Sequence, residues 1–488
     1  MNLADVLLAG ARDAPDRTAL LGDRGPTSFG QLAGAAARLA AQLGDDGVRP
    51  GDRVALVSPT TEAFVTAYLA ALHAGAVCVP LNPAAPPLAL RDELTVVDPT
   101  VVLTAGAGGP AVAEAGWAAR PVDLDTLPAG EAPRADRRPD DVAVLLFTSG
   151  TAGAPRAAML THANLAANLD QVQAHPGLAL RPGDVGLGGL PGFHVFGLNV
   201  VVGLGLAAGA ATVLVERFDA AAAVRLAAEH HVTVLAGVPT MFEALLALDD
   251  RAAPPDAFAG LRLAVSGAAP LPPEVAAAFA SRFGVVLHQG YGLTEASPIV
   301  ATTALSAAAP RPGSIGRPLP GVTVRLVDPA GQDVLAGDPG EVWVAGPNVF
   351  AGYWHDEAAT AAVLDADRFL HTGDVAVADD EGSLWLVDRR KDLIIVSGFN
   401  VYPAEVEDVL AARADVREAA VVGAPSPRTG ETVVAFVVPE PGARPDPAEL
   451  LAHCAQRLAR YKCPTRVELV DALPRTDAGK LLRRALRP

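Results

Sequence analysis

One stretch of the chain gathers residue types that bind phosphate groups. The apolar run Val142–Phe147 is typical of a buried strand, and it ends abruptly in hydroxyls, glycines and one cation: Thr148, Ser149, Gly150, Thr151, Gly153 and Arg156. Glycines let backbone N–H groups approach an anion closely, hydroxyls add donors, and arginine supplies charge on a planar fork. The stretch is a candidate polyphosphate loop. It lacks the Gly-Lys-Ser/Thr ending of a Walker loop, and taken alone it is as well explained by a polar turn.

A second group of chemically capable residues follows another apolar run. In Gln289-Gly-Tyr-Gly-Leu-Thr-Glu295, Tyr291 offers an aromatic face with open space on both sides. Thr294 and Glu295 add a hydroxyl and a carboxylate, which suit a phosphate donor and a Mg²⁺ ligand. The alternative is a β-turn followed by a helix cap.

Three single residues have both a chemical and a plain interpretation. His194 lies in the apolar sequence Phe193-His-Val-Phe196 and is either a core histidine or a pocket residue. Asp374, after Thr372 and Gly373, is either a turn residue or a hydrogen-bond acceptor for a ribose diol. Lys480 follows a glycine turn, where a lysine is ordinarily surface charge.

These residues need elements that bring them together. Apolar strands alternate with helices over residues 1–140, with helices expected at 29–42 and 61–74 and strands at 52–57 and 76–80, which predicts a parallel sheet covered on both faces. Further strand patterns end at Pro239, Pro270 and Glu295. Ligands bind at the carboxyl ends of parallel strands, where Gly267 and Ala268 would leave room for a flat ring.

The predicted pattern of helices and strands changes twice in the rest of the chain. Glycine and proline turns separate short strands over residues 313–387, which predicts a small antiparallel β-subdomain. Residues 393–488 then show helices at 403–413 and 447–460 and strands at 417–422, 432–438 and 465–470. The charged cluster Asp388–Asp392 between them is either a solvated linker or a hinge. The predicted fold is α/β: an N-terminal domain (1–387) of parallel-rich sheets covered by helices with a small β-subdomain, a hinge (388–392), and a small α+β C-terminal lid domain (393–488).

Composition excludes several classes of function. The 488 residues carry 38 Lys and Arg against 55 Asp and Glu, a net charge of −17, which opposes binding to nucleic acid or anionic membranes. The three cysteines lack metal-ligand spacing and suit a reducing, cytoplasmic setting. The uncharged stretch from Val195 to Val215 is long enough to span a bilayer, but its glycines and β-branched end favour a buried helix followed by a strand, with no transmembrane span.

The motifs occur in one order: the Gly/Thr loop, Phe-His-Val-Phe, Tyr-Gly-Leu-Thr-Glu, Thr-Gly-Asp, Asp388-Arg-Arg-Lys391, and Pro474-Arg-Thr-Asp-Ala-Gly-Lys480. Over essentially its whole length the chain resembles the adenylate-forming superfamily of acyl-CoA synthetases, peptide-synthetase adenylation domains and firefly luciferase. Within it, the chain looks like the AMP-forming fatty-acid–CoA ligase branch. The resemblance implies an enzyme with ATP and CoA as substrates and Mg²⁺ as cofactor.

The resemblance also implies roles for individual residues. The catalytic set would be Lys480, Thr294, Glu295 and His194, with Thr148 and Glu295 holding Mg²⁺. ATP and AMP would bind Thr148, Ser149, Gly150, Thr151, Ala152, Gly153, Arg156, Gly267, Ala268, Gln289, Gly290, Tyr291, Thr294, Asp374, Arg389 and Lys480. The acyl group would contact His194, Phe196, Leu198, Gly267, Gly290, Pro298 and Ile299. CoA would bind Arg217, Ser397, Gly398, Phe399, Tyr461 and Lys462. Asp388 and Lys391 would form the hinge about which the lid turns between half-reactions.

Two residues of the phosphate loop depart from the family pattern. Arg156 stands where the loop normally ends in lysine, so charge is kept but a compact ammonium is replaced by a fork. Ala152 replaces a frequent Thr or Ser and removes one hydroxyl donor. We expect nucleotide binding to survive both changes.

The identity of the acid is the most open question. The expected acyl pocket carries no arginine for a diacid and no clear acidic partner for an α-amino group, and its glycines favour a long apolar tail. A medium- or long-chain fatty acid is therefore expected, with an aryl or arylpropenoic acid as the alternative. The acceptor is expected to be CoA, with the phosphopantetheine of an acyl carrier protein or an amine as alternatives. A nucleotide-binding homologue without catalysis, or a phosphotransferase, is the remaining class.

Overall fold

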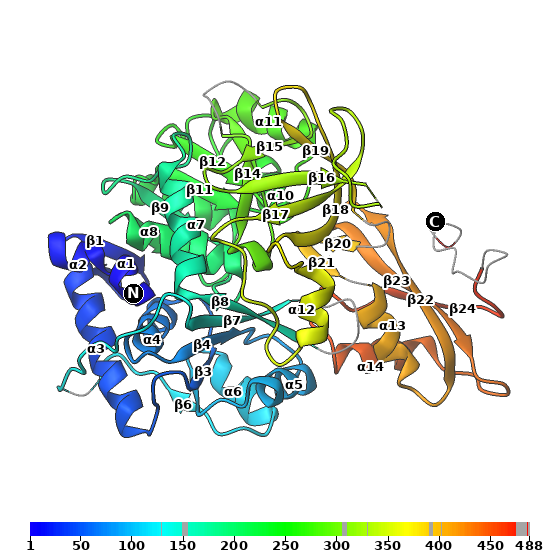
Figure 1. Ribbon diagram of the computed structural model, residues 1–488, viewed down its shortest axis with the longest axis horizontal. Helices are drawn as coiled ribbons and strands as arrows, with labels where there is room; N and C mark the ends of the chain where they lie inside the picture. The colour runs from blue at the N-terminus through cyan, green and yellow to red at the C-terminus, as the bar shows by residue number, and fades with distance from the viewer. Residues whose placement is uncertain are drawn as a thin grey trace.

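The computed structural model describes residues 1–127, 129–148, 155–304, 310–328, 330–389, 394–401, 403–474 and 486. A large N-terminal part holds two sheets, and a smaller C-terminal unit, orange in Figure 1, lies at one end of the molecule. The mixed α/β architecture with a small C-terminal unit confirms the predicted fold class.

The first sheet carries the candidate phosphate loop at its edge. Its six described strands run in the order β6-β5-β3-β4-β7-β8. Neighbours pair in parallel except β7 and β8, which form an antiparallel hairpin. The strands are β3 (Arg53–Val57), β4 (Val77–Leu81), β5 (Val101–Thr104), β6 (Arg120–Pro121), β7 (Val142–Thr148) and β8 (Arg156–Thr161). The loop therefore joins two paired strands, not a strand and a helix.

Several helices of this region begin at residues whose side chains cap them. Helix α3 (Phe29–Asp45) opens with a capping box between Ser28 and Gln31, and Thr61 caps α4 (Glu62–His73). Helix α4 is buried almost all round, as a helix between packed layers must be. The other helices here are α1 (Leu3–Leu7), α2 (Ala9–Asp13), α5 (Pro87–Val97), α6 (Gly108–Glu114) and α7 (His162–Ala174). The helices and strands expected over residues 29–80 are confirmed.

The second sheet joins a parallel half to an antiparallel half. Its described strands run β16-β17-β18-β19-β15-β14-β13-β12-β11-β9-β10-β1-β2. The parallel half comprises β1 (Thr18–Gly22), β10 (Ala211–Leu214), β9 (Val185–Gly188), β11 (Val234–Gly237), β12 (Leu263–Ser266) and β13 (Leu287–Gly292), with β2 (Gly25–Ser28) antiparallel at the edge. Helices α9 (Ala220–Glu229), α10 (Pro239–Leu246) and α11 (Pro273–Phe283) belong to this half.

The antiparallel half is the expected β-subdomain. It consists of β14 (Ile299–Thr302), β15 (Ser314–Pro318), β16 (Thr323–Val327), β17 (Gly340–Ala345), β18 (Leu370–Ala378) and β19 (Leu384–Arg389), with the short helix α12 (Glu357–Val363). Strand β13 pairs with β12 in parallel and with β14 antiparallel, so the subdomain continues the main sheet.

The long uncharged stretch folds as predicted. It forms the π-helix η1 (Phe196–Gly203), the short helix α8 (Leu204–Ala207) and, after a left-handed Gly209, strand β10. Within the described part of the chain, no helix is long and apolar enough to cross a membrane.

The C-terminal unit has its own sheet and core. Strands β20 (Ile394–Val396), β21 (Phe399–Val401), β22 (Val416–Ser426), β23 (Gly430–Pro439) and β24 (Arg466–Leu469) pack with α13 (Pro403–Ala411) and α14 (Pro447–Ala455). Helix α14 is shorter than the expected 447–460, because the backbone turns after Gln456 and leaves the loop that carries Tyr461 and Lys462.

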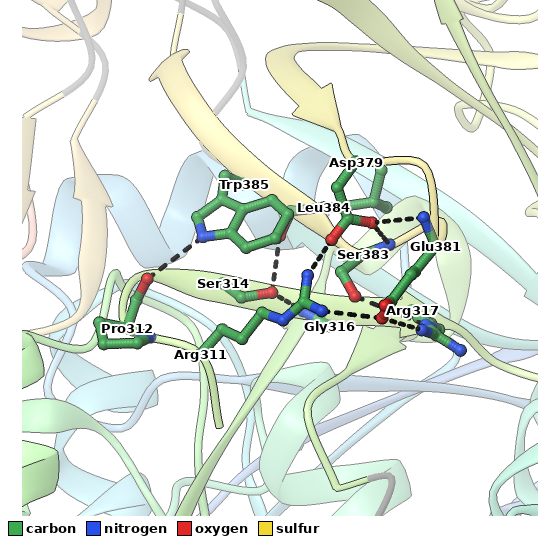
Figure 2. A network of polar contacts seen from close by, with 10 residues as sticks. All are labelled: Arg311, Pro312, Ser314, Gly316, Arg317, Asp379, Glu381, Ser383, Leu384 and Trp385. Carbon is green, nitrogen blue, oxygen red and sulfur yellow. Dashed lines mark hydrogen bonds and ion pairs between the residues drawn. The ribbon is translucent and has the colours of Figure 1, made fainter. Parts of the chain in front are cut away.

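A polar network holds the β18–β19 turn against β15, as Figure 2 shows. Arg311 contacts Asp379 and donates to Glu381 at 2.8 Å, and Arg317 donates to the same Glu381 at 3.2 Å. The Ser314 hydroxyl donates to the Leu384 carbonyl at 2.9 Å. The network fixes the hairpin that carries Asp374.

Gly316 allows strand β15 to lie close to strand β14. Its φ is 80°, and a Cβ there would collide with the backbone of Thr302. We expect Gly316→Ala to cost about 3 kcal/mol or more, since the left-handed strain of about 1–2 kcal/mol is joined by a backbone displacement. Gly331→Ala is the matched control, because Gly331 has a φ of 84° and no described atom within 4 Å of a Cβ. Thermal unfolding of both variants measures the difference; equal losses would contradict the close approach.

Candidate active site

One cavity of about 1580 Å³ gathers most of the predicted site residues. It lies where the parallel strands end and is closed on one side by the C-terminal unit. Among the residues that line it are Thr148, Arg156, His194, Phe196, Arg217, Gly267, Ala268, Gly290, Tyr291, Thr294, Glu295, Pro298, Ile299, Asp374, Ser397, Gly398, Phe399, Tyr461 and Lys462. Leu198 and Gln289 are not among them: Leu198 is buried in the core, and Gln289 pairs through its backbone with Thr303.

Several predicted residues cannot be placed. Ser149, Gly150, Thr151, Ala152 and Gly153 of the phosphate loop lie outside the described residues, as do Lys391 and Lys480. For Asp388 and Arg389 the backbone alone is described; Arg389 pairs with Asp374 in the β18–β19 ladder. Their roles stay predictions.

The two ends of the phosphate loop are held together. Thr148 and Arg156 are direct partners in the β7–β8 hairpin, and both line the cavity. Nε of Arg156 donates to Oδ2 of Asp356 at 3.2 Å, and the guanidinium lies 5.9 Å from the ring centroid of Tyr353. The arginine fork thus ties the end of the loop to the segment before α12.

The same segment reaches the candidate metal ligand. The hydroxyl of Tyr353 donates to Oε1 of Glu295 at 2.7 Å, and the backbone N–H of Phe350 donates to the Glu295 carbonyl at 2.9 Å. Burial raises the pKa of Glu295 above its ordinary value, and the hydrogen bond from Tyr353 works against this shift. Glu295 is consequently held in one orientation at the cavity wall.

Tyr291 and Asp374 meet across the two halves of the second sheet. The Tyr291 hydroxyl donates to Oδ2 of Asp374 at 2.7 Å. Ala268, one residue beyond Gly267, has a φ of 64°, a conformation that non-glycine residues seldom adopt outside functional sites. Gly267, Ala268 and Tyr291 thus form one wall of the cavity, with the Asp374 carboxylate beside it.

His194 lies at the centre of an aromatic row. Its ring centroid is 4.8 Å from that of Phe193 and 5.3 Å from that of Phe399, which in turn stacks on Tyr461 at 4.4 Å. Nε2 of His194 is shielded from solvent and has no hydrogen-bond partner in the described part of the chain. Burial, aided by the charge of Lys462, lowers the pKa of His194 to about 4, so the imidazole is neutral at physiological pH.

The turn of the C-terminal unit at Ser397–Phe399 projects into this cavity. Gly398 has a φ of 84°, and a Cβ there would lie 3.1 Å from the side chain of Val238, at the end of β11. Glycine therefore permits the C-terminal unit to lie close to the end of the parallel sheet at this point.

The sequence interpretation missed Tyr353, Asp356, Glu93 and Glu405. Tyr353 and Asp356 reach the site because residues 351–354 hydrogen-bond to β8, a pairing without a local sequence signal. Glu93 and Glu405 come together only where α5 meets the C-terminal unit, and both line the cavity.

The chain belongs to the AMP-binding enzyme family. Residues 8–354 match this family, and residues 405–480 match the AMP-binding enzyme C-terminal domain. It is an adenylate-forming acyl-CoA ligase, an AMP-forming acid–thiol ligase whose substrates are a small carboxylic acid, ATP and CoA.

The chain is similar to ligases of several acid classes. A feruloyl-CoA synthase of Amycolatopsis sp is 40% identical over 98% of this chain and 96% of its own length. A long-chain-fatty-acid–CoA ligase of Escherichia coli is 36% identical over 90% of this chain and 86% of its own. An o-succinylbenzoate CoA synthetase of Bacillus subtilis, bound to a product analogue, superposes with a TM-score of 0.90 at 30% identity, covering 99% of this chain and 98% of that one.

The Arg156–Asp356 pair is expected to affect the KM for ATP. Arg156→Lys removes the Nε–H donor of this hydrogen bond, and Asp356→Asn removes its Oδ2 acceptor. The asparagine of the second variant would still cap α12, as Asp356 does by accepting from the N–H of Ala359. We expect each substitution to raise the KM for ATP about two- to fivefold, which corresponds to the interaction free energy of a partly exposed ion pair. The double variant is expected to have the same KM as either single variant, because both substitutions affect one interaction.

Steady-state kinetics on the four proteins measure the coupling. Asp333→Asn, which breaks the similar but remote Arg325–Asp333 pair, serves as control and leaves the KM for ATP unchanged. Additive effects in the double variant would show that Arg156 and Asp356 act independently.

Proposed function

We propose that this enzyme activates a medium- or long-chain fatty acid to acyl-AMP and transfers the acyl group to CoA. The observation that carries the proposal is the depth of the cavity. From His194 and Gly267 it continues along the face of the parallel sheet, between β9–β12 and η1, as far as Gly186, Gly205 and Thr212.

The strand register gives the length of this acyl channel. Gly186, Val234 and Leu263 lie side by side on neighbouring strands, and Leu263 is four residues before Gly267. At about 3.3 Å per residue, the channel runs roughly 13 Å below the strand ends. Its walls there are uncharged: Gly186, Val200, Val201, Leu204, Val234 and Leu263. A long apolar tail suits such a channel, and a charged tail does not.

The nucleotide would lie across the strand ends. The adenine would lie against Gly267, Ala268 and Tyr291, and the ribose hydroxyls would bind Asp374 and Arg389. The hydroxyl of Thr148 and the buried carboxylate of Glu295 are hard oxygen donors that suit Mg²⁺, which takes few protein ligands and completes its shell with phosphate oxygens. Bound there, Mg²⁺ would neutralise charge on the phosphates.

In the first half-reaction a carboxylate oxygen of the acid attacks the α-phosphorus of ATP. The new P–O bond forms as the α–β anhydride bond breaks, and pyrophosphate leaves from the loop between Thr148 and Arg156. Thr294 would donate to the α-phosphate, and Lys480 would screen the two anions that must meet.

In the second half-reaction the CoA thiol, having lost its proton, attacks the acyl carbonyl, and the C–O bond to AMP breaks. We propose that the C-terminal unit turns about Asp388–Lys391 between the steps. The orientation described here, with Ser397–Phe399 beside His194, suits the thiol step. Neutral His194 would donate its one ring N–H to the reacting carbonyl group; with a pKa of about 4 it would not hold a second proton at neutral pH.

An arylpropenoic acid is the second candidate. It is supported by the 40% identity to a feruloyl-CoA synthase over nearly the whole chain. A planar aryl acid would fill the upper cavity beside Gly267 and Gly290 and leave the channel below Val265 empty.

An acid panel tests the proposal. ATP–pyrophosphate exchange and acyl-CoA formation, detected by mass spectrometry, are measured with hexanoate, decanoate, palmitate, ferulate and benzoate. We expect exchange to be fastest with decanoate or palmitate, and free CoA to be acylated. Exchange with ferulate or benzoate alone would replace the fatty-acid proposal with the aryl one.

A substitution in the channel gives an independent check. A Cβ at Gly186 would meet nothing closer than 3.9 Å, so the valine side chain of Gly186→Val would enter the channel without disturbing β9. We expect this variant to lose palmitate activity about tenfold or more while keeping hexanoate activity, the internal control, within about twofold, because only the longer chain would reach residue 186. A proportional loss with both acids would place the acyl chain elsewhere.

A further inference from the structure

A cluster of charged side chains lies where the C-terminal unit meets the N-terminal part. Nζ of Lys462 donates to Oε1 of Glu405 at 2.6 Å, and both side chains are largely shielded from solvent. Glu93, on α5 of the N-terminal part, faces this pair and lines the same cavity. Lys462, Glu405 and Tyr461 face Glu93 from the C-terminal unit, and Asp92 lies beside it on its own helix.

The charges of this cluster do not balance. Glu93 and Glu405 supply two carboxylates, and Lys462 supplies one ammonium. Oε2 of Glu93 and Oε2 of Glu405 are both closed off from solvent and have no hydrogen-bond partner among the residues that the structure describes. An unpaired carboxylate out of contact with water is unfavourable, and the usual resolution is to bind a proton.

We propose that Glu93 is a positioning residue for the thioester-forming half-reaction: it receives the C-terminal unit through Lys462 and Glu405, and docking in this orientation places a proton on its carboxyl group. The inference rests on the proposed function, since it assigns this orientation to the thiol step. It adds a residue of α5 that acts on one half-reaction and not on the other.

The direction of the pH dependence follows from burial. Burial raises the pKa of Glu93 to about 7; the ammonium of Lys462 works against this shift, and the carboxylates of Glu405 and Asp92 add to it. With the C-terminal unit turned away, Glu93 would be exposed and titrate near its ordinary value of about 4.3. Docking would then take up a proton between these two values. It weakens as the pH rises through this window and levels off above about 7, where the docked form also ionises.

Charge reversal separates the two half-reactions. Glu93→Lys places a second ammonium against Lys462, and we expect it to slow single-turnover transfer from acyl-AMP to CoA about tenfold or more, while ATP–pyrophosphate exchange stays within about twofold. Glu114→Lys is the matched control: it makes the same change of charge at an exposed residue of the neighbouring helix α6, which does not line the cavity, and it leaves both rates within about twofold of the wild type. Equal slowing of both half-reactions by Glu93→Lys, no effect on transfer, or an equal effect of Glu114→Lys would overturn the proposal.

Replacing Glu93 with its neutral isostere tests whether docking protonates this residue. Glutamine has the shape of a protonated glutamic acid, so the Glu93→Gln variant is expected to fold as the wild type does. The ratio of its transfer rate to that of the wild type is expected to rise several-fold from about pH 5.5 to about pH 7 and to stay level above about pH 7.5. Ionisation of the CoA thiol cancels in this ratio, because both enzymes use the same CoA. A ratio that stays constant over the whole pH range would show that docking does not place a proton on Glu93. Absence of exchange with every acid in the wild type would instead reject the proposed function.

Discussion

The hydrogen bond from Tyr291 to Asp374 forms because strand β13 belongs to two kinds of sheet at once. On one side β13 pairs in parallel with β12, which places its carboxyl end beside the carboxyl ends of the other parallel strands, where ligands commonly bind. On the other side it pairs antiparallel with β14, and that pairing continues through β15 and β19 to β18, which carries Asp374. A parallel sheet alone would supply no second wall to the cavity, and an antiparallel sheet alone would supply no row of strand ends. The remaining contacts of the site are arranged around this junction.

Three regions of the cavity lie in line across the junction. The strand ends suit a nucleotide, the channel beneath them suits an apolar acyl chain, and the turn at Ser397–Phe399 closes the opposite side with aromatic contacts to His194. The regions meet at His194 and Gly267, where the proposed reactions of the acid, the phosphate and the thiol would take place. Because that point is enclosed, its hydrogen bonds operate away from water, where they are stronger.

Residues beside a strand end could be predicted from the sequence, and residues brought in by long-range pairing could not. Gly267, Tyr291 and Glu295 follow apolar runs, and the rule for parallel strands places them together. Tyr353 and Asp356 reach Glu295 and Arg156 through backbone pairing with β8, for which hydrophobic periodicity gives no signal. Glu93 belongs to an otherwise ordinary amphipathic helix and is enclosed only when a distant unit docks on it. The sequence pattern predicts an α14 that is too long, because apolar residues continue to the buried Leu458 after the helix has ended.

The two unsatisfied oxygens beneath Lys462 affect how long the C-terminal unit stays in place. An interface that satisfied every polar group, or replaced Glu93 with a leucine, would hold more tightly and release more slowly. In the proposed cycle, different parts of the C-terminal unit enter the same cavity in turn, so turnover would depend on residence time as well as on chemistry. The unpaired carboxylate oxygens at this contact would therefore favour turnover, because the docked orientation could last long enough for acyl transfer and still release before the next molecule of ATP enters.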